Sequence, residues 1–317
     1  MEIILHLGAH RTASTSFQHY LRKNGARLAA MGIGVWGPPR TRDGLMEGVL
    51  PRPGLPGASK QVARAAGRIA LALHDAEAAG IRQLIVSDEN MIGSPRGTLR
   101  DGRLYAAMGE RMARYDAAFG GRVSRVVLSI RAQDAWWPSC IAYAVARGAR
   151  LPRSAHLARI ATSPRGWRDV ITDLACAVPS AEVMVMPHES FAARPEARLT
   201  AMTGQGDAPL AHAREWLNRA PDLAMLRRLL HERGGDPRAL PQGEGRWQPF
   251  SREERAALSE AYADDLFWLR AGAGGLATLM EEPGKPEAGT RPAGPDQTRG
   301  RPHDQEGARR LAQAGRG

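Results

Sequence analysis

The strongest constraint on the fold of this 317-residue chain lies between residues 3 and 18, where an apolar strand runs into a polar loop and then a helix. The apolar run IILHL ends at Gly8, and an amphipathic helix opens near Phe17. A loop between a strand and a helix N-terminus collects free backbone N–H groups and the positive end of the helix dipole. We therefore expect a phosphate-like anion to bind here, among two basic side chains and four hydroxyl groups: His10, Arg11, Thr12, Ser14, Thr15 and Ser16.

The loop differs from the common nucleotide-binding P-loop, G-x-x-x-x-G-K-[ST]. Counted from Gly8, Ala13 takes the position of the second glycine and Ser14 takes the position of the lysine. The basic residue lies inside the loop instead, at Arg11. An ordinary ATPase or GTPase uses a lysine at the start of the helix to hold the phosphates, so the spacing argues against one.

A second strand-and-helix unit covers residues 122–147. Its apolar run over 122–130 predicts a buried strand, and Arg131 closes that strand. Ser139 follows eight residues later, in the expected helix over 133–147. The Arg guanidinium is charged and can donate two hydrogen bonds at once, and the Ser hydroxyl can donate one more. Together they can bind a phosphate group. Alone, the pair is more typical of an arginine that ends a strand and a serine on a polar helix face than of a phosphate site.

Polar side chains also follow the short apolar run at residues 83–86. Asp88 and Glu89 lie at the carboxyl end of the strand expected over 83–88, which is the edge where α/β proteins place their sites. Each carboxylate is suited either to accept a proton from a substrate or to cap the following turn. Glu89 is the first candidate for a general base and Asp88 the second.

The loop pattern G-x-x-basic-T-x-[ST]-T-S and the strand–Arg–helix–Ser unit together resemble the two donor-binding motifs of sulfotransferases that use 3′-phosphoadenosine 5′-phosphosulfate (PAPS). In that family the loop binds the 5′-phosphosulfate and the second unit binds the 3′-phosphate. The resemblance implies binding of the 5′-phosphosulfate by Gly8, Arg11, Thr12, Ala13, Ser14, Thr15 and Ser16, and of the 3′-phosphate by Arg131 and Ser139.

Two residues depart from the family pattern. The family usually has Lys where this chain has Arg11, and Gly where it has Ala13. Arg11 keeps the positive charge and adds a two-donor fork, but it is larger than Lys. Ala13 adopts a positive φ only at an energetic cost, if the loop requires one there.

The resemblance implies a transferase that moves the sulfuryl group from PAPS to a hydroxyl or amine. Glu89 is then the catalytic base, and Arg11 offsets charge on the leaving phosphate. His10 is a rival base inside the loop, or else a neutral histidine bonded to the backbone. Asn218 and Arg219 match a pair found in bacterial members of the family and have no assigned role. The acceptor stays open between carbohydrate, lipid, small metabolite and peptide.

Two further functions are kept as alternatives. A P-loop kinase or other nucleotide phosphotransferase would share the strand–loop–helix motif, but the chain lacks the lysine near the helix start. A non-catalytic nucleotide-binding member of the same fold is compatible with the departures at Arg11 and Ala13, because a fold does not fix a function.

The composition of the chain restricts its partners and its setting. A hydrophobic content of 43% supports a substantial core, and the net charge of +11 suits an anionic ligand. No nucleic-acid-binding motif accompanies that charge, so no specific nucleic-acid partner is expected. No apolar stretch is long enough to cross a bilayer and no signal peptide precedes the first strand, so we expect a cytoplasmic protein. Cys140 and Cys176 are the only cysteines, so we expect no disulfide framework and no metal site.

The alternation of strands and helices predicts an α/β fold with three layers, a mostly parallel sheet flanked by helices, as in P-loop-type sulfotransferases. We expect one domain over 1–271, in which the Pro/Gly-rich segment 36–60 is a lid or binding loop, and a disordered Gly/Pro-rich tail over 272–317. The expected elements besides those above are helices over 16–31, 60–79 (capped by Ser59), 102–119, 166–177 and 252–270 (opened by Ser251), and a strand over 181–186. Trp136 and Trp137 suit either adenine stacking or the core.

Overall fold

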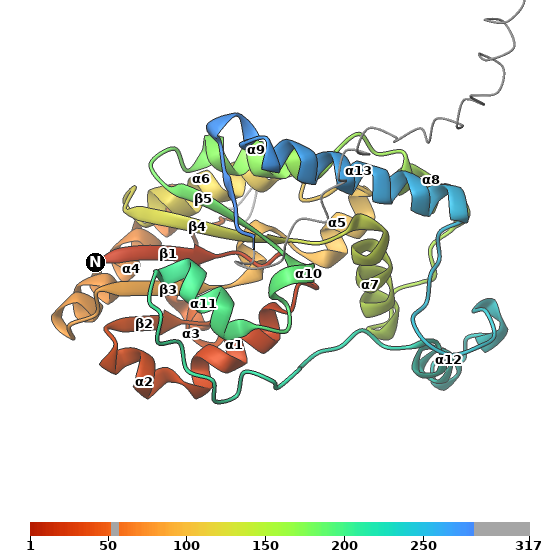
Figure 1. Cartoon of the computed structure of the whole chain (residues 1–317), viewed down its shortest axis with the longest axis horizontal. Helices are drawn as coiled ribbons and strands as arrows, with labels where there is room; N and C mark the ends of the chain where they lie inside the picture. Colours follow the sequence, from red (N-terminus) through yellow and green to blue (C-terminus); the bar gives the residue numbers. More distant parts are fainter. Residues whose placement is uncertain (52–56, 282–317) are drawn as a thin grey trace, which may run out of the picture. The chain divides into compact units, whose positions relative to one another are not determined.

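A parallel sheet forms the centre of the protein, which is described by a computed structural model over residues 1–51 and 57–281. Six strands pair in the order β2-β3-β1-β4-β5-β6 (Figure 1). Every pairing between neighbours is parallel. The strands are β1 (Glu2–His6), β2 (Ile33–Trp36), β3 (Gln83–Ser87), β4 (Val123–Ile130), β5 (Glu182–Pro187) and β6 (Thr278–Leu279).

Helices cover both faces of the sheet, which confirms the predicted three-layer α/β architecture. Side chains alternate along β1, so that Ile3 and Leu5 pack on one face and Ile4 on the other. One face is covered by α4 (Ala58–Ala78), α6 (Met108–Ala118), α9 (Trp167–Ala177) and α13 (Arg252–Arg270), and the other by α1 (Ser14–Lys23), α2 (Gly25–Ala30) and α11 (Pro195–Thr203). The central strands read as apolar runs because both of their faces are buried.

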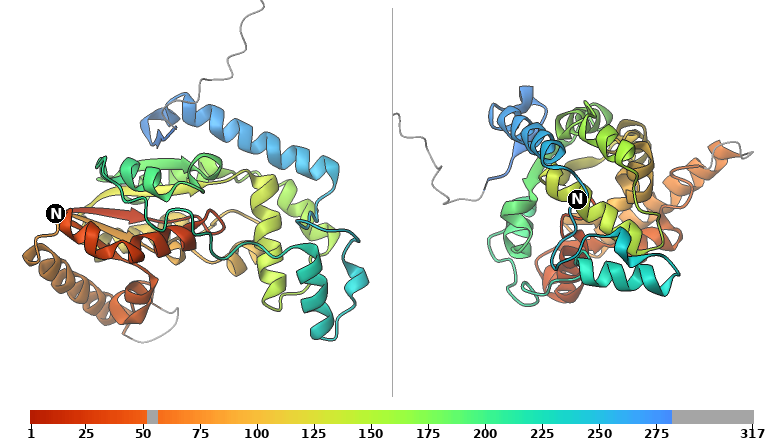
Figure 2. Two further views of the ribbon diagram at one scale, coloured as in Figure 1. Left: turned by 60° about the horizontal axis from the view of Figure 1, so that its bottom comes forward. Right: turned by 90° about the vertical axis from the view of Figure 1, so that its right-hand side faces the viewer.

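A further group of helices lies beyond the carboxyl ends of the strands. In Figures 1 and 2, α7 (Gln133–Ala146) and α12 (Leu223–Glu232) lie on that side of the sheet. The remaining short helices are α3 (Pro38–Arg40), α5 (Pro95–Asp101), α8 (Ser154–Ala161) and α10 (His188–Phe191). Within the described residues, no helix is both long enough and apolar enough to pass through a membrane.

Three predicted helix boundaries were wrong. The helix expected over 16–31 is split at Asn24, where the backbone leaves helical geometry and the side chain donates to the carbonyls of Tyr20 and Ala211. The helix expected over 60–79 begins at Ala58, so Ser59 lies inside it and is no cap. The helix expected over 102–119 begins only at Met108, because Gly102 adopts a left-handed conformation that ends the preceding helix α5, and turns follow as far as residue 107.

The predicted domain ends ten residues too early. Residues 272–281 are part of the α/β unit, because Thr278 and Leu279 pair with β5 as the edge strand β6. The remainder of the predicted tail, 282–317, lies outside the described residues, as does 52–56 of the predicted lid segment. The short strand β2 also went unpredicted, because four residues that include Gly34 show no clear period.

The start of α13 is confirmed: Ser251 Oγ accepts a hydrogen bond from the Glu254 amide at 3.1 Å, and the Glu254 carboxylate accepts one from the Ser251 amide at 2.8 Å. Later in the same helix, Asp265 joins α13 to the N-terminus of α9. Its buried carboxylate accepts hydrogen bonds from the amides of Trp167 at 2.8 Å and Arg168 at 3.0 Å.

Replacing Asp265 should therefore destabilise the fold. We expect Asp265→Ala to lower the free energy of unfolding by about 3 kcal/mol, because two amides at the start of α9 lose a charged acceptor. Its exposed neighbour provides the control, since Asp264→Ala should change stability by less than about 0.5 kcal/mol. Urea unfolding of the two variants and the wild type measures both values. Equal effects of the two substitutions would contradict this role.

Candidate functional site

Pairing of β1 with β4 brings the two sequence motifs to one edge of the sheet. The ladder continues past the strand end, where the amides of Leu7 and Ala9 donate to the carbonyls of Val127 and Ser129 at 2.9 and 2.8 Å. The loop that begins at Gly8 therefore lies beside the end of β4, where Arg131 follows. Residues more than 100 positions apart in the sequence become neighbours at the carboxyl edge.

The backbone of the loop turns into the left-handed region three times. Gly8 has φ of 82°, Arg11 of 62° and Ala13 of 66°. A Cβ atom on Gly8 would lie 2.9 Å from the Cβ of Glu89, so only glycine fits there. Ala13 is the N-cap of α1 and offers no side-chain acceptor. The first amides of this helix are consequently left for a ligand.

A cavity of about 640 Å³ opens at this helix start. Six residues of the two predicted motifs line it: Arg11, Ala13, Ser14, Thr15, Arg131 and Ser139. The other predicted loop residues, Gly8, Thr12 and Ser16, are buried behind the lining. Thr12 holds the loop together by donating its hydroxyl to the Ala9 carbonyl at 2.7 Å.

Direct hydrogen bonds join the two motifs across the cavity wall. Arg11 Nε donates to Ser139 Oγ at 3.1 Å, and Arg131 Nη1 donates to the Arg11 carbonyl at 2.9 Å. The Arg11 guanidinium also lies over the Tyr143 ring, 4.9 Å from its centroid. Burial lowers the pKa of both arginines, but the guanidinium group stays protonated in proteins. The motifs thus present two fixed positive charges to the same space.

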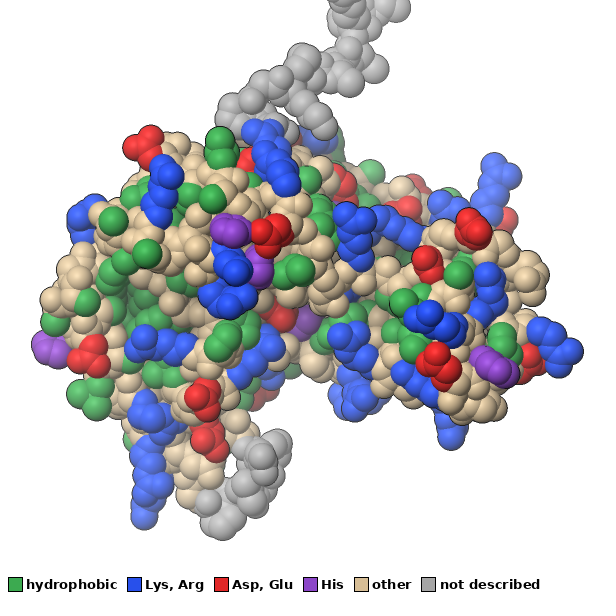
Figure 3. Space-filling model, turned by 90° about the horizontal axis from the view of Figure 1, so that it is seen from below, with side chains coloured by type: hydrophobic (Ala, Val, Ile, Leu, Met, Phe, Trp, Pro, Cys, Tyr) green, Lys and Arg blue, Asp and Glu red, His purple; other side chains and the backbone are tan. Residues whose placement is uncertain are grey.

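Residues that the motifs did not contain complete the lining. The cavity is lined by five arginines and a single carboxylate: Arg11, Arg131, Arg219, Arg246 and Arg255 against Asp134. On the face of the molecule seen in Figure 3, basic side chains likewise predominate over acidic ones. This charge balance favours an anion that carries several negative charges.

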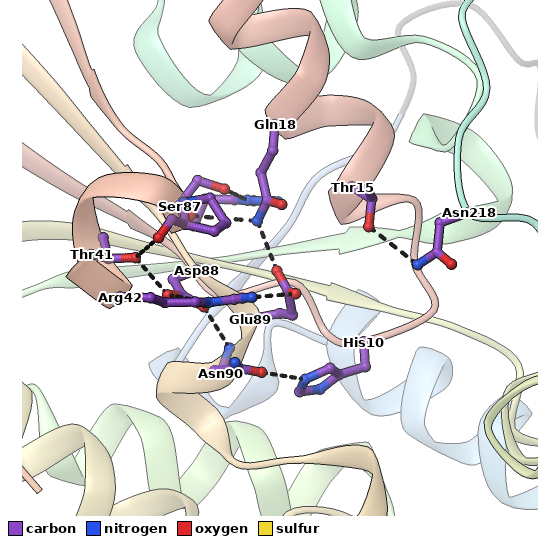
Figure 4. Close-up of polar contacts among 12 residues, drawn as sticks. His10, Thr15, Gln18, Thr41, Arg42, Ser87, Asp88, Glu89, Asn90 and Asn218 are labelled. Atoms are coloured by element: carbon purple, nitrogen blue, oxygen red, sulfur yellow. Dashed lines mark hydrogen bonds and ion pairs between the residues drawn. The ribbon is translucent and has the colours of Figure 1, made fainter. Parts of the chain in front are cut away.

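The chain around Asn218 closes one side of the cavity. Asn218 Nδ2 donates to Thr15 Oγ1 at 3.4 Å (Figure 4). The neighbouring Leu217 amide donates to Ser16 Oγ at 2.9 Å. Asn218 and Arg219 were noted in the sequence without a role, and the structure places both at the cavity. Arg246 and Trp247 also line it, but they lie in an irregular segment with no motif that could have identified them.

The tryptophans of α7 belong to the core and not to the cavity wall. Trp136 and Trp137 are 0% and 1% exposed, which favours the core interpretation of both over adenine stacking. Trp136 Nε1 donates to the His10 carbonyl at 2.7 Å and so supports the loop from behind. The aromatic rings that do line the cavity are Trp216 and Trp247.

Glu89 does not line the cavity, and Figure 4 shows its polar contacts with Gln18 and Arg42. Its carboxylate accepts hydrogen bonds from Gln18 at 2.7 Å and from Arg42 at 3.1 Å. Gln18 lines a separate, mainly apolar groove of about 540 Å³, which shares Thr15 and Leu217 with the cavity. Glu89 lines neither hollow, but its hydrogen-bond partner Gln18 lines the groove.

Asp88 is the more enclosed of the two candidate carboxylates. Its side chain is 5% exposed against 14% for Glu89. It accepts hydrogen bonds from Thr41 Oγ1 at 2.6 Å and from the Asn90 amide at 2.9 Å, and it pairs with Arg42 at 2.6 Å. Asp88 thus caps the short helix Glu89–Ile92. Thr41 and Arg42 belong to segment 36–60, the predicted lid or binding loop. This segment therefore contacts Asp88 and Glu89.

His10 is fixed by neighbours on both ring nitrogens. Tyr105 Oη lies 3.0 Å from Nδ1 and also accepts from the His10 amide at 3.1 Å, while Asn90 Oδ1 lies 3.2 Å from Nε2. A neutral ring with its proton on Nε2 satisfies all three contacts. Burial lowers the pKa of His10, which also favours the neutral form.

Comparison of the chain with protein-family models and with curated protein sequences finds no match. Within residues 1–51 and 57–281, no group of three or more His, Cys, Asp or Glu side chains is arranged to hold a metal ion. Any assignment of function therefore rests on the chemistry of the cavity.

The left-handed backbone of Ala13 predicts a stabilising substitution. Ala13→Gly should raise the free energy of unfolding by about 1 kcal/mol, because Gly adopts a positive φ without steric cost. Ala63 lies exposed inside α4, so Ala63→Gly should instead lower stability by about 1 kcal/mol. Thermal unfolding of both variants tests whether their changes in stability have opposite signs. A loss of stability in Ala13→Gly would contradict the strain assigned to the loop.

Proposed function

We propose that the protein is a PAPS-dependent sulfotransferase, which moves a sulfuryl group to a hydroxyl or amine of its acceptor. One observation carries the proposal: Arg11 and Ser139, which belong to the two separate donor-binding motifs, are hydrogen-bonded at 3.1 Å and line the same cavity. If the two short motifs matched the family by chance, their residues would not be expected to line the same cavity.

The cavity has the charge and the size for the donor. Its volume of about 640 Å³ lies within the range of pockets that hold nucleotide-sized ligands. In the proposed complex, Arg131 and Ser139 bind the 3′-phosphate by charge-assisted hydrogen bonds. Arg11 and the free amides at the start of α1 bind the 5′-phosphosulfate. Arg219, Arg246 and Arg255 add positive charge for a ligand that carries two phosphate groups.

The proposed reaction is an in-line displacement at sulfur. The acceptor oxygen attacks the sulfur atom, the bond between sulfur and the bridging phosphate oxygen breaks, and 3′-phosphoadenosine 5′-phosphate leaves. Glu89 takes the acceptor proton, and Arg11 offsets the charge that develops on the leaving phosphate. We propose that the acceptor enters through the groove lined by Gln18, whose side-chain amide donates to the Glu89 carboxylate.

A non-catalytic nucleotide-binding protein is the second candidate. It is favoured by the contacts of Glu89, whose carboxylate is already bound by Gln18 and Arg42 and does not line the donor cavity. Calorimetry with 3′-phosphoadenosine 5′-phosphate, ADP and ATP–Mg²⁺ separates a PAPS site from a kinase site. Preference for ATP–Mg²⁺ would favour a P-loop kinase. Turnover of PAPS with an acceptor then distinguishes the enzyme from the binding protein.

Arg131 should decide whether the 3′-phosphate is recognised. We expect the wild type to bind 3′-phosphoadenosine 5′-phosphate at least 100-fold more tightly than AMP, and Arg131→Ala to remove most of that preference. Arg252→Ala is the control, because Arg252 is exposed at the start of α13 and does not line the cavity. Calorimetric titration of both nucleotides gives the ratio. An unchanged ratio in Arg131→Ala would reject this assignment.

Glu89 should affect turnover and not donor binding. We expect Glu89→Gln to lower kcat by a factor of about 100 to 10,000, because the amide cannot take the acceptor proton. Its dissociation constant for 3′-phosphoadenosine 5′-phosphate should stay within about twofold of the wild type, since Glu89 does not line the cavity. His10→Gln serves as a comparison for the rival base. A large loss of kcat in His10→Gln alone would transfer the role to His10.

A further inference from the structure

A buried arginine without a counter-charge lies behind the anion-binding loop. Arg198 belongs to α11 and is 1% exposed, which places it among the largest fully buried side chains of the protein. Within the described part of the chain it makes no ion pair with a carboxylate. An unpaired charge in a protein interior is expensive, so its retention needs an explanation.

The contacts of Arg198 are too few for a purely structural role. Its Nη2 atom donates to the Thr12 carbonyl at 3.2 Å, and its guanidinium lies over the Phe17 ring, 5.1 Å from the centroid. Among residues 1–51 and 57–281, its Nε and Nη1 atoms have no hydrogen-bond partner. Burial alone lowers the pKa of this guanidinium to about 10, and no acidic neighbour acts to raise it. The side chain therefore stays charged at neutral pH and without compensation.

Among the residues that the structure describes, no carboxylate raises the pKa of Arg198. His6, on β1, and His188, which lines the cavity, are two titratable groups whose pKa the charge of Arg198 lowers. Burial lowers the pKa of both imidazoles, and Arg198 lowers it further, so both are neutral. The Thr12 carbonyl, to which Arg198 donates, belongs to the loop that leads into the start of α1.

We propose that the counter-charge of Arg198 is the phosphate-type anion of the bound ligand, so that Arg198 is a positioning residue for the anion-binding loop. It holds the Thr12 carbonyl away from the cavity, which leaves the following amides turned toward the ligand. The ligand-free protein bears the cost of an uncompensated buried cation, and binding of the anion relieves it. This inference rests on the anion-binding part of the proposed function and not on sulfuryl transfer.

The proposal predicts opposite effects of one substitution on stability and on binding. Arg198→Met keeps most of the side-chain volume and removes the charge. We expect the ligand-free variant to unfold about 3 °C higher than the wild type, because a buried unpaired charge is lost. We expect its affinity for 3′-phosphoadenosine 5′-phosphate and for inorganic pyrophosphate to fall about tenfold, because the anion loses a cation held at low dielectric. Arg198→Lys keeps the charge and should retain affinity better than Arg198→Met.

A paired arginine provides the matched control. Arg125 also donates to a backbone carbonyl, that of Met202, at 2.6 Å, but it is bridged to Glu182 at 2.8 Å and does not line the cavity. Arg125→Met should lower the unfolding temperature and leave both affinities unchanged. Differential scanning calorimetry and titration calorimetry on the full chain measure all four proteins.

Each result either supports or overturns the role proposed for Arg198. A lower unfolding temperature for ligand-free Arg198→Met, or a failure of that variant to fold, would show that the arginine stabilises the empty protein and would overturn the proposal. Unchanged affinity for pyrophosphate would overturn it as well. Binding of pyrophosphate without binding of 3′-phosphoadenosine 5′-phosphate would reject the PAPS assignment but leave the role of Arg198 standing, provided that Arg198→Met weakens pyrophosphate.

Discussion

Parallel pairing of β1 with β4 is the constraint on which the rest of the site depends. Both strands run in the same direction, so the loop after β1 and the Arg131 turn after β4 must open at the same edge of the sheet. The main-chain ladder extends into the loop as far as Ala9, whose amide donates to Ser129. The positions of the cavity groups therefore follow from backbone hydrogen bonds, which are more rigid than contacts between side chains.

Positive charge is concentrated around this edge at a cost to the empty protein. Arg11 and Arg131 are largely buried and contact each other's segments, while Arg198 lies deeper and has no carboxylate partner among the described residues. Such an arrangement is unfavourable unless an anion is bound, because like charges repel most strongly where water is excluded. The same charges that would weaken the empty fold would supply binding energy for a doubly phosphorylated ligand.

The sequence allowed much of the fold and part of the site to be predicted. The apolar runs that became β1, β3, β4 and β5 are buried on both faces, so they could be recognised without knowledge of their partners. β2 and β6 could not be recognised in this way. They are short edge strands, which form because they pair with a neighbouring strand and not because of their own hydrophobic pattern. The split at Asn24 was equally hidden, since it depends on a hydrogen bond to Ala211, a residue distant in the sequence.

The sequence by itself determined the parallel α/β fold and the two polar motifs, because strand burial and the strand–loop–helix spacing are local properties of the chain. Only the tertiary structure decided how those motifs combine. It placed Arg11 against Ser139, left Glu89 outside the cavity lining, and brought Arg219, Arg246 and Arg255 to the cavity wall. It also buried Arg198 behind Thr12. These relations depend on the packing of distant segments, in which each side chain acquires its burial and its partners only when the whole sheet has formed.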